Sequence, residues 1–134
     1  MAKKKAAQPD LGGVAIRWRD DVAEHDYASA QAYLSLRFDD QRASQIVARL
    51  RKAELSTRRA NDILRAAGLD PAPLDDPGVI KDLIKIIEGD KLSPVLVISG
   101  ADRADIADGF HRVSLVYRVD PYGQVPLRLA DAGT

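Results

Sequence analysis

The sequence contains no cysteine, and its only histidines are His25 and His111. Without cysteine the chain cannot form a disulfide, a thiol nucleophile or a thiolate metal site. Two histidines are too few for a histidine-rich metal centre. The sequence therefore excludes disulfide scaffolds, thiol enzymes and histidine-rich metalloproteins, and we expect no metal site.

Long apolar runs are also missing, and so is an excess of charge of either sign. No apolar stretch approaches the roughly 18–20 residues that a membrane-spanning helix needs. The basic residues 1–5 are not followed by the apolar region of a secretory signal. Lys plus Arg and Asp plus Glu number 20 each, so the formal net charge is zero. We expect a soluble cytoplasmic protein with no membrane role and no dominant nucleic-acid footprint.

The zero net charge hides a difference between the two halves of the chain. Residues 1–67 carry 13 basic and 9 acidic side chains, whereas residues 68–134 carry 7 and 11. The basic half contains a cluster on two expected helices, formed by Arg49, Arg51, Lys52, Arg58 and Arg59. DNA contact is one interpretation of this cluster. The preferred one is a solvated face paired with acidic residues.

A length of 134 residues and an apolar content of 46% predict one domain with a substantial core. Residues 1–13 are interpreted as a disordered tail, because three lysines, Pro9 and two glycines offer little to bury. The domain spans residues 14–134, with a helical part over 14–73 and a mixed core over 74–130. This layout predicts an α+β fold.

The helical part shows apolar residues at helical spacing in three segments. We expect helices over residues 26–37, from near 39 to 53, and over 58–67. Asp26 is the expected N-cap of the first helix, and Ser56 or Thr57 the cap of the third. Gly68 is typical of the residue that follows a helix and is expected to end the third one.

The mixed core begins with a helix and then changes to apolar runs of strand length. Asp76 as N-cap and Pro77 as first residue start a helix that ends at Gly89. We expect a buried strand over 94–99, a partner strand over 105–108, a helix over 112–118 and a strand over 125–129. Pro126 favours an edge or strand-start position, because proline has no N–H for a neighbouring strand.

The most informative stretch is residues 106–112, Ile-Ala-Asp-Gly-Phe-His-Arg, between an expected strand and an expected helix. A glycine turn at a helix N-terminus directs backbone N–H groups outward, and anions bind there readily. Arg112 adds a planar fork suited to phosphate or carboxylate. His111 adds a donor, or a general acid or base. Gly109 meets the backbone need of such a turn.

Each of these residues also has a purely structural interpretation. His111 can form a local bond at the start of the helix. Arg112 can pair internally with Asp105 or Asp108. Asp108 is more often a helix N-cap than a catalytic acid in such a position. The sequence leaves both interpretations open for each residue.

The succession of a helix, KLSPVLVIS, a turn, IADGFHRVSLVYR and VPLRLA resembles the ParB/sulfiredoxin-like superfamily over residues 74–130. In such domains a helix leads into a strand, and a second strand ends in a glycine turn with a basic pair. A helix and a final strand follow. Residues 59–66 also look like the lead-in of a bacterial ParB-like subgroup with no assigned activity. The resemblance implies a small mixed α/β core of this type.

In members of this superfamily that bind nucleotides, the glycine turn and its basic residues hold phosphates. The resemblance transfers this role to Gly109, His111 and Arg112, with ATP, ADP or CTP and Mg²⁺ as the implied ligands. Free-serine kinases of the superfamily have an Asp-Gly-His-Thr-Arg motif, which Asp108, Gly109 and Arg112 match in spacing. The resemblance then implies that Asp108 assists Mg²⁺ or a substrate hydroxyl.

Two departures narrow what the resemblance implies. Sulfiredoxins have a reactive cysteine where this chain has Phe110, so sulfinic-acid reduction by that route is excluded. Some relatives hold phosphate with Lys, Ser and Thr on the preceding helix. The matching positions here are Val79, Asp82 and Ile86. Lys81 and Lys85 are expected nearby but on another face of that helix.

Two functions remain. The first is binding of a nucleotide or another small phosphorylated ligand at residues 108–112. Phosphoryl transfer would be a further step, with Asp108 and His111 as catalytic residues. The alternative is a non-enzymatic module whose helical part binds a protein or DNA. The sequence does not decide whether the protein is an enzyme, and it sets no oligomeric state.

Overall fold

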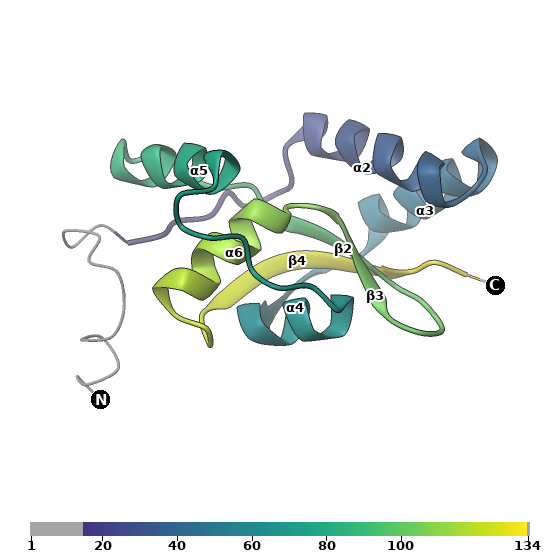
Figure 1. Ribbon diagram of the computed structural model, residues 1–134. Coiled ribbons are helices and arrows are strands. Elements are labelled where there is room, and N and C mark those ends of the chain that lie inside the picture. Colours follow the sequence, from purple (N-terminus) through teal and green to yellow (C-terminus); the bar gives the residue numbers. More distant parts are fainter. Residues whose placement is uncertain (1–14, 134) are drawn as a thin grey trace.

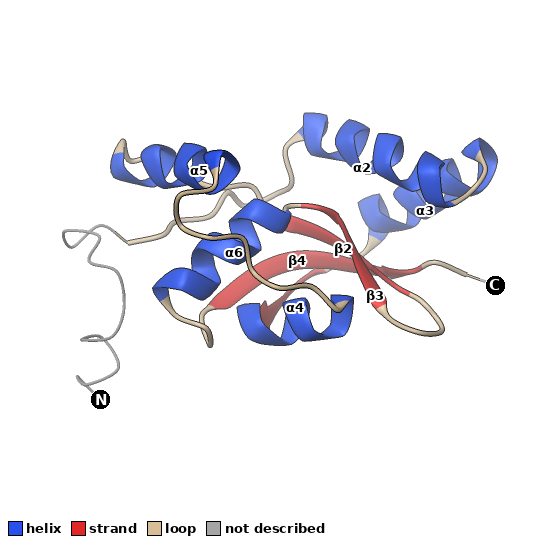
Figure 2. Ribbon diagram, viewed as in Figure 1, coloured by secondary structure: helices blue, strands red, loops and turns tan. Residues whose placement is uncertain are grey.

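The computed structural model describes residues 15–133, so the predicted tail over 1–13 lies outside the described residues. These residues form five helices and a four-stranded mixed sheet, which confirms the α+β class (Figure 1). Figure 2 shows the strands in the middle of the molecule, with helices on both sides. Within 15–133, no helix combines the length and apolarity that crossing a bilayer requires.

Helices α2 (Glu24–Arg37) and α3 (Asp40–Lys52) lie side by side at one end of the molecule (Figure 1). Asp39 caps α3 and accepts a hydrogen bond of 2.7 Å from a backbone N–H of its first turn, close to the predicted start. The prediction that Asp26 caps the first helix is wrong. Helix α2 begins before Asp26, whose buried side chain faces another partner.

The sheet joins strands from both predicted parts of the chain. Its members are β1 (Leu55–Arg59), β2 (Val95–Ser99), β3 (Ala104–Asp108) and β4 (Gln124–Asp131). The strand order is β1-β4-β2-β3, so β1 and β3 form the two edges. Strand β4 pairs antiparallel with β1 and parallel with β2, and β2 pairs antiparallel with β3. The strands predicted over 94–99, 105–108 and 125–129 are confirmed.

Strand β1 occupies the place where the third helix was expected to begin. Ser56 and Thr57 do not cap a helix, because both pair with β4. Helix α4 (Ala60–Ala67) starts after this strand and ends at Gly68, whose φ of 67° is left-handed, as predicted. Every residue of β1 is exposed, so the strand carries no apolar alternation for sequence analysis to detect.

Pro126 lies near the start of the inner strand β4, so of the two predicted positions the edge strand is wrong, whereas the strand start is close to what is observed. At Pro126 the strand is paired on one side only, with Thr57 of β1. Pairing with β2 begins one residue later, at Leu127. The missing proline N–H therefore does not interrupt the ladder between β4 and β2.

Alternation along the strands divides the core between two layers, because successive side chains point to opposite faces. Leu96 and Ile98 of β2 pack with α2 and α3, whereas Val95 and Val97 pack with α4 and α6. Helix α6 (Phe110–Val119) crosses the second face of the sheet (Figure 1).

Helix α5 (Pro77–Ile87) lies at the periphery, at the end of the molecule away from α3, and packs against α6 (Figure 1). Its start is as predicted, since Asp76 accepts hydrogen bonds from two N–H groups of the first turn and Pro77 is the first helical residue. Val79 and Ile86 are buried against α6. The fold thus brings the starts of α2, α5 and α6 close to the end of β3.

Candidate functional site

Gly109 forms the turn between β3 and α6. Its φ is 113°, and an added Cβ would lie 2.4 Å from Val95 Cγ1 and 2.9 Å from the Arg112 guanidinium. Both the backbone conformation and the available space therefore require glycine. As the N-cap of α6, Gly109 has no side chain to satisfy the first N–H groups of the helix. The helix starts before the predicted Arg112, so His111 lies within its first turn.

Arg112 is held between two carboxylates. Its guanidinium lies 3.0 Å from Asp26 of α2 and 2.8 Å from Asp108 of β3. The Arg112 side chain is 12% exposed and that of Asp26 is 5% exposed. The internal pairing with Asp108 was one interpretation of the sequence, whereas the pairing with Asp26 was missed. Asp105, the other expected partner, pairs with Arg37 instead.

Asp108 is the last residue of β3, and its carboxylate is bound to Arg112. It is not the N-cap of α6, so that structural interpretation is wrong. Burial raises the pKa of Asp108 above its ordinary value, and the neighbouring Asp26 carboxylate acts in the same direction. Attraction to Arg112 opposes this rise without cancelling it.

His111 forms the local bond that its structural interpretation predicted. Its Nε2 lies 3.2 Å from Oδ2 of Asp76, the residue that caps α5. The imidazole also covers Gly78, where an added Cβ would lie 2.6 Å from the ring. The side chain nevertheless remains 49% exposed. Asp76 therefore orients the ring while leaving much of it accessible to a ligand.

A cavity of about 300 Å³ opens beside this turn. Its wall includes the first turn of α6, Asp26 at the start of α2, and Lys81, Asp82 and Lys85 of α5. Lys81 and Lys85 lie close to the site, as expected, but the expectation that they lie on another face than Asp82 is wrong, because all three line the cavity. Both lysines are exposed.

The charges around the cavity are not equally available to a ligand. Asp26 and Asp108 occupy Arg112, whereas Lys81 and Lys85 have no ion-pair partner among the described residues. Burial raises the pKa of Asp82, and attraction to Arg112 partly opposes that rise, with smaller contributions from Lys85, His111 and Lys81. The two lysines therefore already attract one carboxylate at the cavity. The available positive charge is therefore that of the two lysines together with the partial charge of the α6 N-terminus.

The site has few side chains that could serve as ligands for a bound metal ion. Among residues 15–133, no three carboxylate or imidazole groups are placed to hold one. Asp108, the residue expected to assist Mg²⁺, is engaged by Arg112. Mg²⁺ accompanying a nucleotide would thus be held mainly by the phosphates of that ligand.

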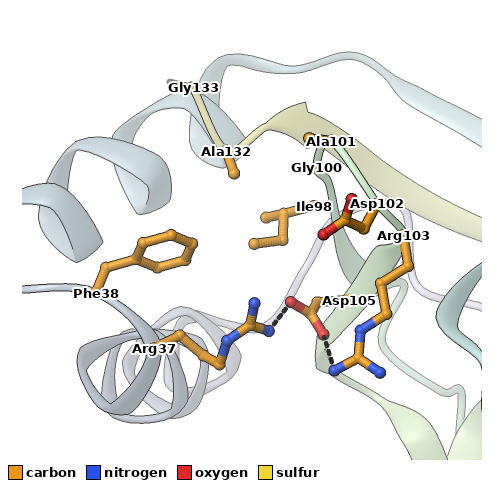
Figure 3. Close-up of a pocket in the computed structure, with 10 residues that line it drawn as sticks. All are labelled: Arg37, Phe38, Ile98, Gly100, Ala101, Asp102, Arg103, Asp105, Ala132 and Gly133. Carbon is orange, nitrogen blue, oxygen red and sulfur yellow. Dashed lines mark hydrogen bonds and ion pairs between the residues drawn. The ribbon is translucent and has the colours of Figure 1, made fainter.

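A second cavity, of about 190 Å³, lies at the opposite end of β3 (Figure 3). Arg37 and Arg103 both point toward the buried carboxylate of Asp105 (Figure 3). The hydroxyl of Tyr33 donates to the same carboxylate at 3.3 Å. Asp102 also lines this cavity, so the two arginines are balanced by two acids. We therefore place the candidate site at the first cavity.

The basic cluster predicted on residues 49–59 is partly engaged within the protein. Arg51 pairs with Glu24 at 2.8 Å, and Arg59 pairs with Asp62 at 3.1 Å. Arg49 donates to a backbone carbonyl near the end of β4. These contacts agree with the preferred interpretation of a solvated, acid-paired face, and DNA binding stays a prediction.

Comparisons of the chain with protein-family models, with curated proteins and with solved structures found no match. The resemblance to the ParB/sulfiredoxin-like superfamily therefore stays a prediction. The structure defines an α+β domain with a polar cavity at a helix N-terminus, and any function has to be argued from that cavity.

Proposed function

We propose that this protein binds a small phosphorylated ligand, such as a nucleotide, in the cavity at the start of α6. The observation that carries the proposal is a convergence of positive groups. One cavity of about 300 Å³ is reached by the N-terminus of α6, which Gly109 leaves uncapped, and by Lys81 and Lys85. Helix N–H groups donate hydrogen bonds to phosphate oxygens, and lysine supplies a mobile point charge for the same group.

The roles of the motif residues follow from their contacts. Gly109 lets the ligand approach the backbone, and His111 supplies an imidazole held in place by Asp76. Arg112 is a positioning residue in this proposal, because it connects Asp26 of α2 to Asp108 of β3. A direct contact between Arg112 and phosphate would have to compete with two carboxylates.

The proposal is limited to binding. Phosphoryl transfer with Asp108 as the base would require a carboxylate that accepts a proton from the ligand. Asp108 has the raised pKa that such a role needs, but Arg112 already binds it. No observation places His111 or Asp108 against a reacting group, so their catalytic roles stay predictions.

The test is thermal unfolding with a panel of ligands: inorganic phosphate, pyrophosphate, and ATP, ADP, CTP and GTP with Mg²⁺. A ligand at about 100 times its Kd should add about 2.7 kcal/mol to the free energy of unfolding. We expect this stabilisation in the wild type and its loss in the double variant Lys81→Gln/Lys85→Gln. Arg112→Ala is a poor probe, because it would remove the guanidinium that pairs with both the buried Asp26 and the partly buried Asp108.

The matched control is Lys52→Gln/Lys91→Gln, which removes the same charge at two exposed positions outside the cavity. It should keep the full ligand-dependent shift. Sodium chloride at equal ionic strength controls for general salt effects and should affect all variants alike. If no ligand of the panel stabilises the wild type, or both double variants lose the shift equally, the proposed site is wrong.

A further inference from the structure

Helix α5 has an apolar stripe that the protein does not bury. Ile80, Ile84 and Ile87 follow the i, i+4, i+7 spacing of one helix face and are 39%, 48% and 59% exposed. The apolar positions on the adjacent face of the helix, Val79 and Ile86, already pack against α6. The stripe is therefore additional to the surface that holds α5 in the fold.

No described element covers this stripe. Among the described residues α6 is the main neighbour of α5, which lies at the periphery of the molecule (Figure 1). Single exposed apolar residues are ordinary, as with Leu36 on α2. Three isoleucines in register on one helix are different, because they form the kind of contiguous seam by which helices pair.

We infer that this stripe packs against the same stripe of a second copy, with the two α5 helices antiparallel. The charges beside the stripe support this arrangement. Lys81 and Glu88 lie on the same flank, because they are seven residues apart, about two helical turns. Both are exposed, and neither has an ion-pair partner among residues 15–133.

A two-fold axis through Ile84 brings opposite charges together. At 1.5 Å of rise per residue, Lys81 lies roughly 4.5 Å before Ile84 and Glu88 roughly 6 Å after it. In an antiparallel pair related by a two-fold axis, the flank that carries Lys81 and Glu88 in one copy lies beside the same flank of the other copy. Lys81 of each copy therefore meets Glu88 of the other at nearly the same height. The contact would carry two such ion pairs around an isoleucine centre.

A parallel pair lacks this complementarity. It would bring the Lys81 flank of one copy against the opposite flank of the other. That flank includes Leu83, which already packs partly into the protein's own core. The antiparallel contact rests on three isoleucines of one short helix, whereas a stable interface normally buries about 800 Å² per partner. We therefore expect a weak dimer with a Kd in the micromolar to millimolar range.

The test is sedimentation equilibrium of the full chain without ligand, at protein concentrations up to about 1 mM. The wild type should show a concentration-dependent dimer, and Ile84→Glu should raise its Kd at least tenfold. Leu36→Glu is the matched control, because Leu36 is 87% exposed on a different helix. Thermal unfolding of both variants checks that each is folded.

Charge reversal tests the antiparallel geometry itself. Lys81→Glu and Glu88→Lys should each raise the dimer Kd by about fivefold. Each variant removes both ion pairs of the dimer, and an exposed ion pair contributes about 0.5 kcal/mol. The double variant should restore the wild-type Kd.

A wild type that stays monomeric to 1 mM overturns the inference and leaves the stripe to another occupant. A dimer that Ile84→Glu does not weaken, or a double variant that fails to recover, overturns it too. Because no ligand is present, the result is independent of the proposed phosphate site.

Discussion

Gly109 is the residue at which conformation and space are both restricted. Alanine would have to adopt φ near 113° and place its Cβ 2.4 Å from Val95 Cγ1. Strain of this kind costs on the order of 1–3 kcal/mol for the backbone alone, and the contact with Val95 adds to it. We expect Gly109→Ala to lower the free energy of unfolding by more than about 3 kcal/mol in urea denaturation.

Gly68 provides the comparison for this prediction. Its φ of 67° is also left-handed, but nothing lies within 4 Å of an added Cβ. Gly68→Ala should therefore show only the backbone term, about 1 kcal/mol. Equal losses in the two variants would mean that contact with Val95 does not restrict the turn at the candidate site.

Asp82 should make the stability of the protein depend on pH. Burial raises its pKa in the folded state, so the ionised carboxylate is less stable there than in the unfolded chain. The protonated Asp82 side chain therefore favours the folded state. Its contribution to the free energy of unfolding is complete below the unfolded pKa, near 4, and is lost as the pH rises through the raised folded-state pKa. We expect Asp82→Asn to match the wild-type Tm near pH 3 and to exceed it by about pH 7.

The control for Asp82→Asn is Asp75→Asn, which removes an exposed acid outside the cavity. Differences in Tm from the wild type are compared across the pH range, so effects common to all three proteins cancel. A difference for Asp82→Asn that does not change with pH, or a variant less stable than the wild type at neutral pH, would contradict burial as the cause of the raised pKa.

Part of the candidate site could be predicted from single residues. Asp108, Gly109, His111 and Arg112 lie within five consecutive positions, and their order between a strand and a helix predicted the turn that the structure has. Anion binding at that turn stays a prediction. The contribution of Asp26 could not be found in this way. It is 86 positions from Arg112, and only the packing of α2 beside β3 brings the two together.

At the scale of elements, predictions succeeded where local chemistry determines the structure. Asp76 and Pro77 define the start of α5, and Gly68 defines the end of α4, because caps act within one helical turn. Strand β1 has no such local signal. Its five exposed residues form a strand because β4 offers an unpaired edge, which is a tertiary condition.

The predicted division at residues 73 and 74 illustrates the same limit. Strand β1 lies before that boundary and pairs with β4, which lies after it. Arg112 and Asp26 also connect the two parts through a buried ion pair. The apolar pattern located most of the helices and strands, but it carried no information on which distant elements would share a sheet.

Across the whole molecule, stability should be unevenly distributed. The described core has two large clusters of thirteen and eleven buried residues on the two faces of the sheet, and a third of five between α5 and α6. Helix α5 depends on the smallest cluster, whereas every residue of β4 is paired with β1 or β2, and Leu127 and Arg128 are paired with both. We therefore expect α5 to open without unfolding of the sheet.

Native-state hydrogen exchange in low guanidinium chloride measures this difference directly. The amides of α5 should exchange at an opening free energy about 2 kcal/mol or more below those of β4, with a weaker dependence on denaturant. Amides near Leu127 should exchange only through global unfolding, because that residue is 1% exposed in the central strand. Equal opening energies and equal denaturant slopes for α5 and β4 would show one cooperative unit instead. Repeating the experiment at higher protein concentration separates intrinsic stability from association, because a contact between two α5 stripes would slow exchange in α5 and leave β4 unchanged.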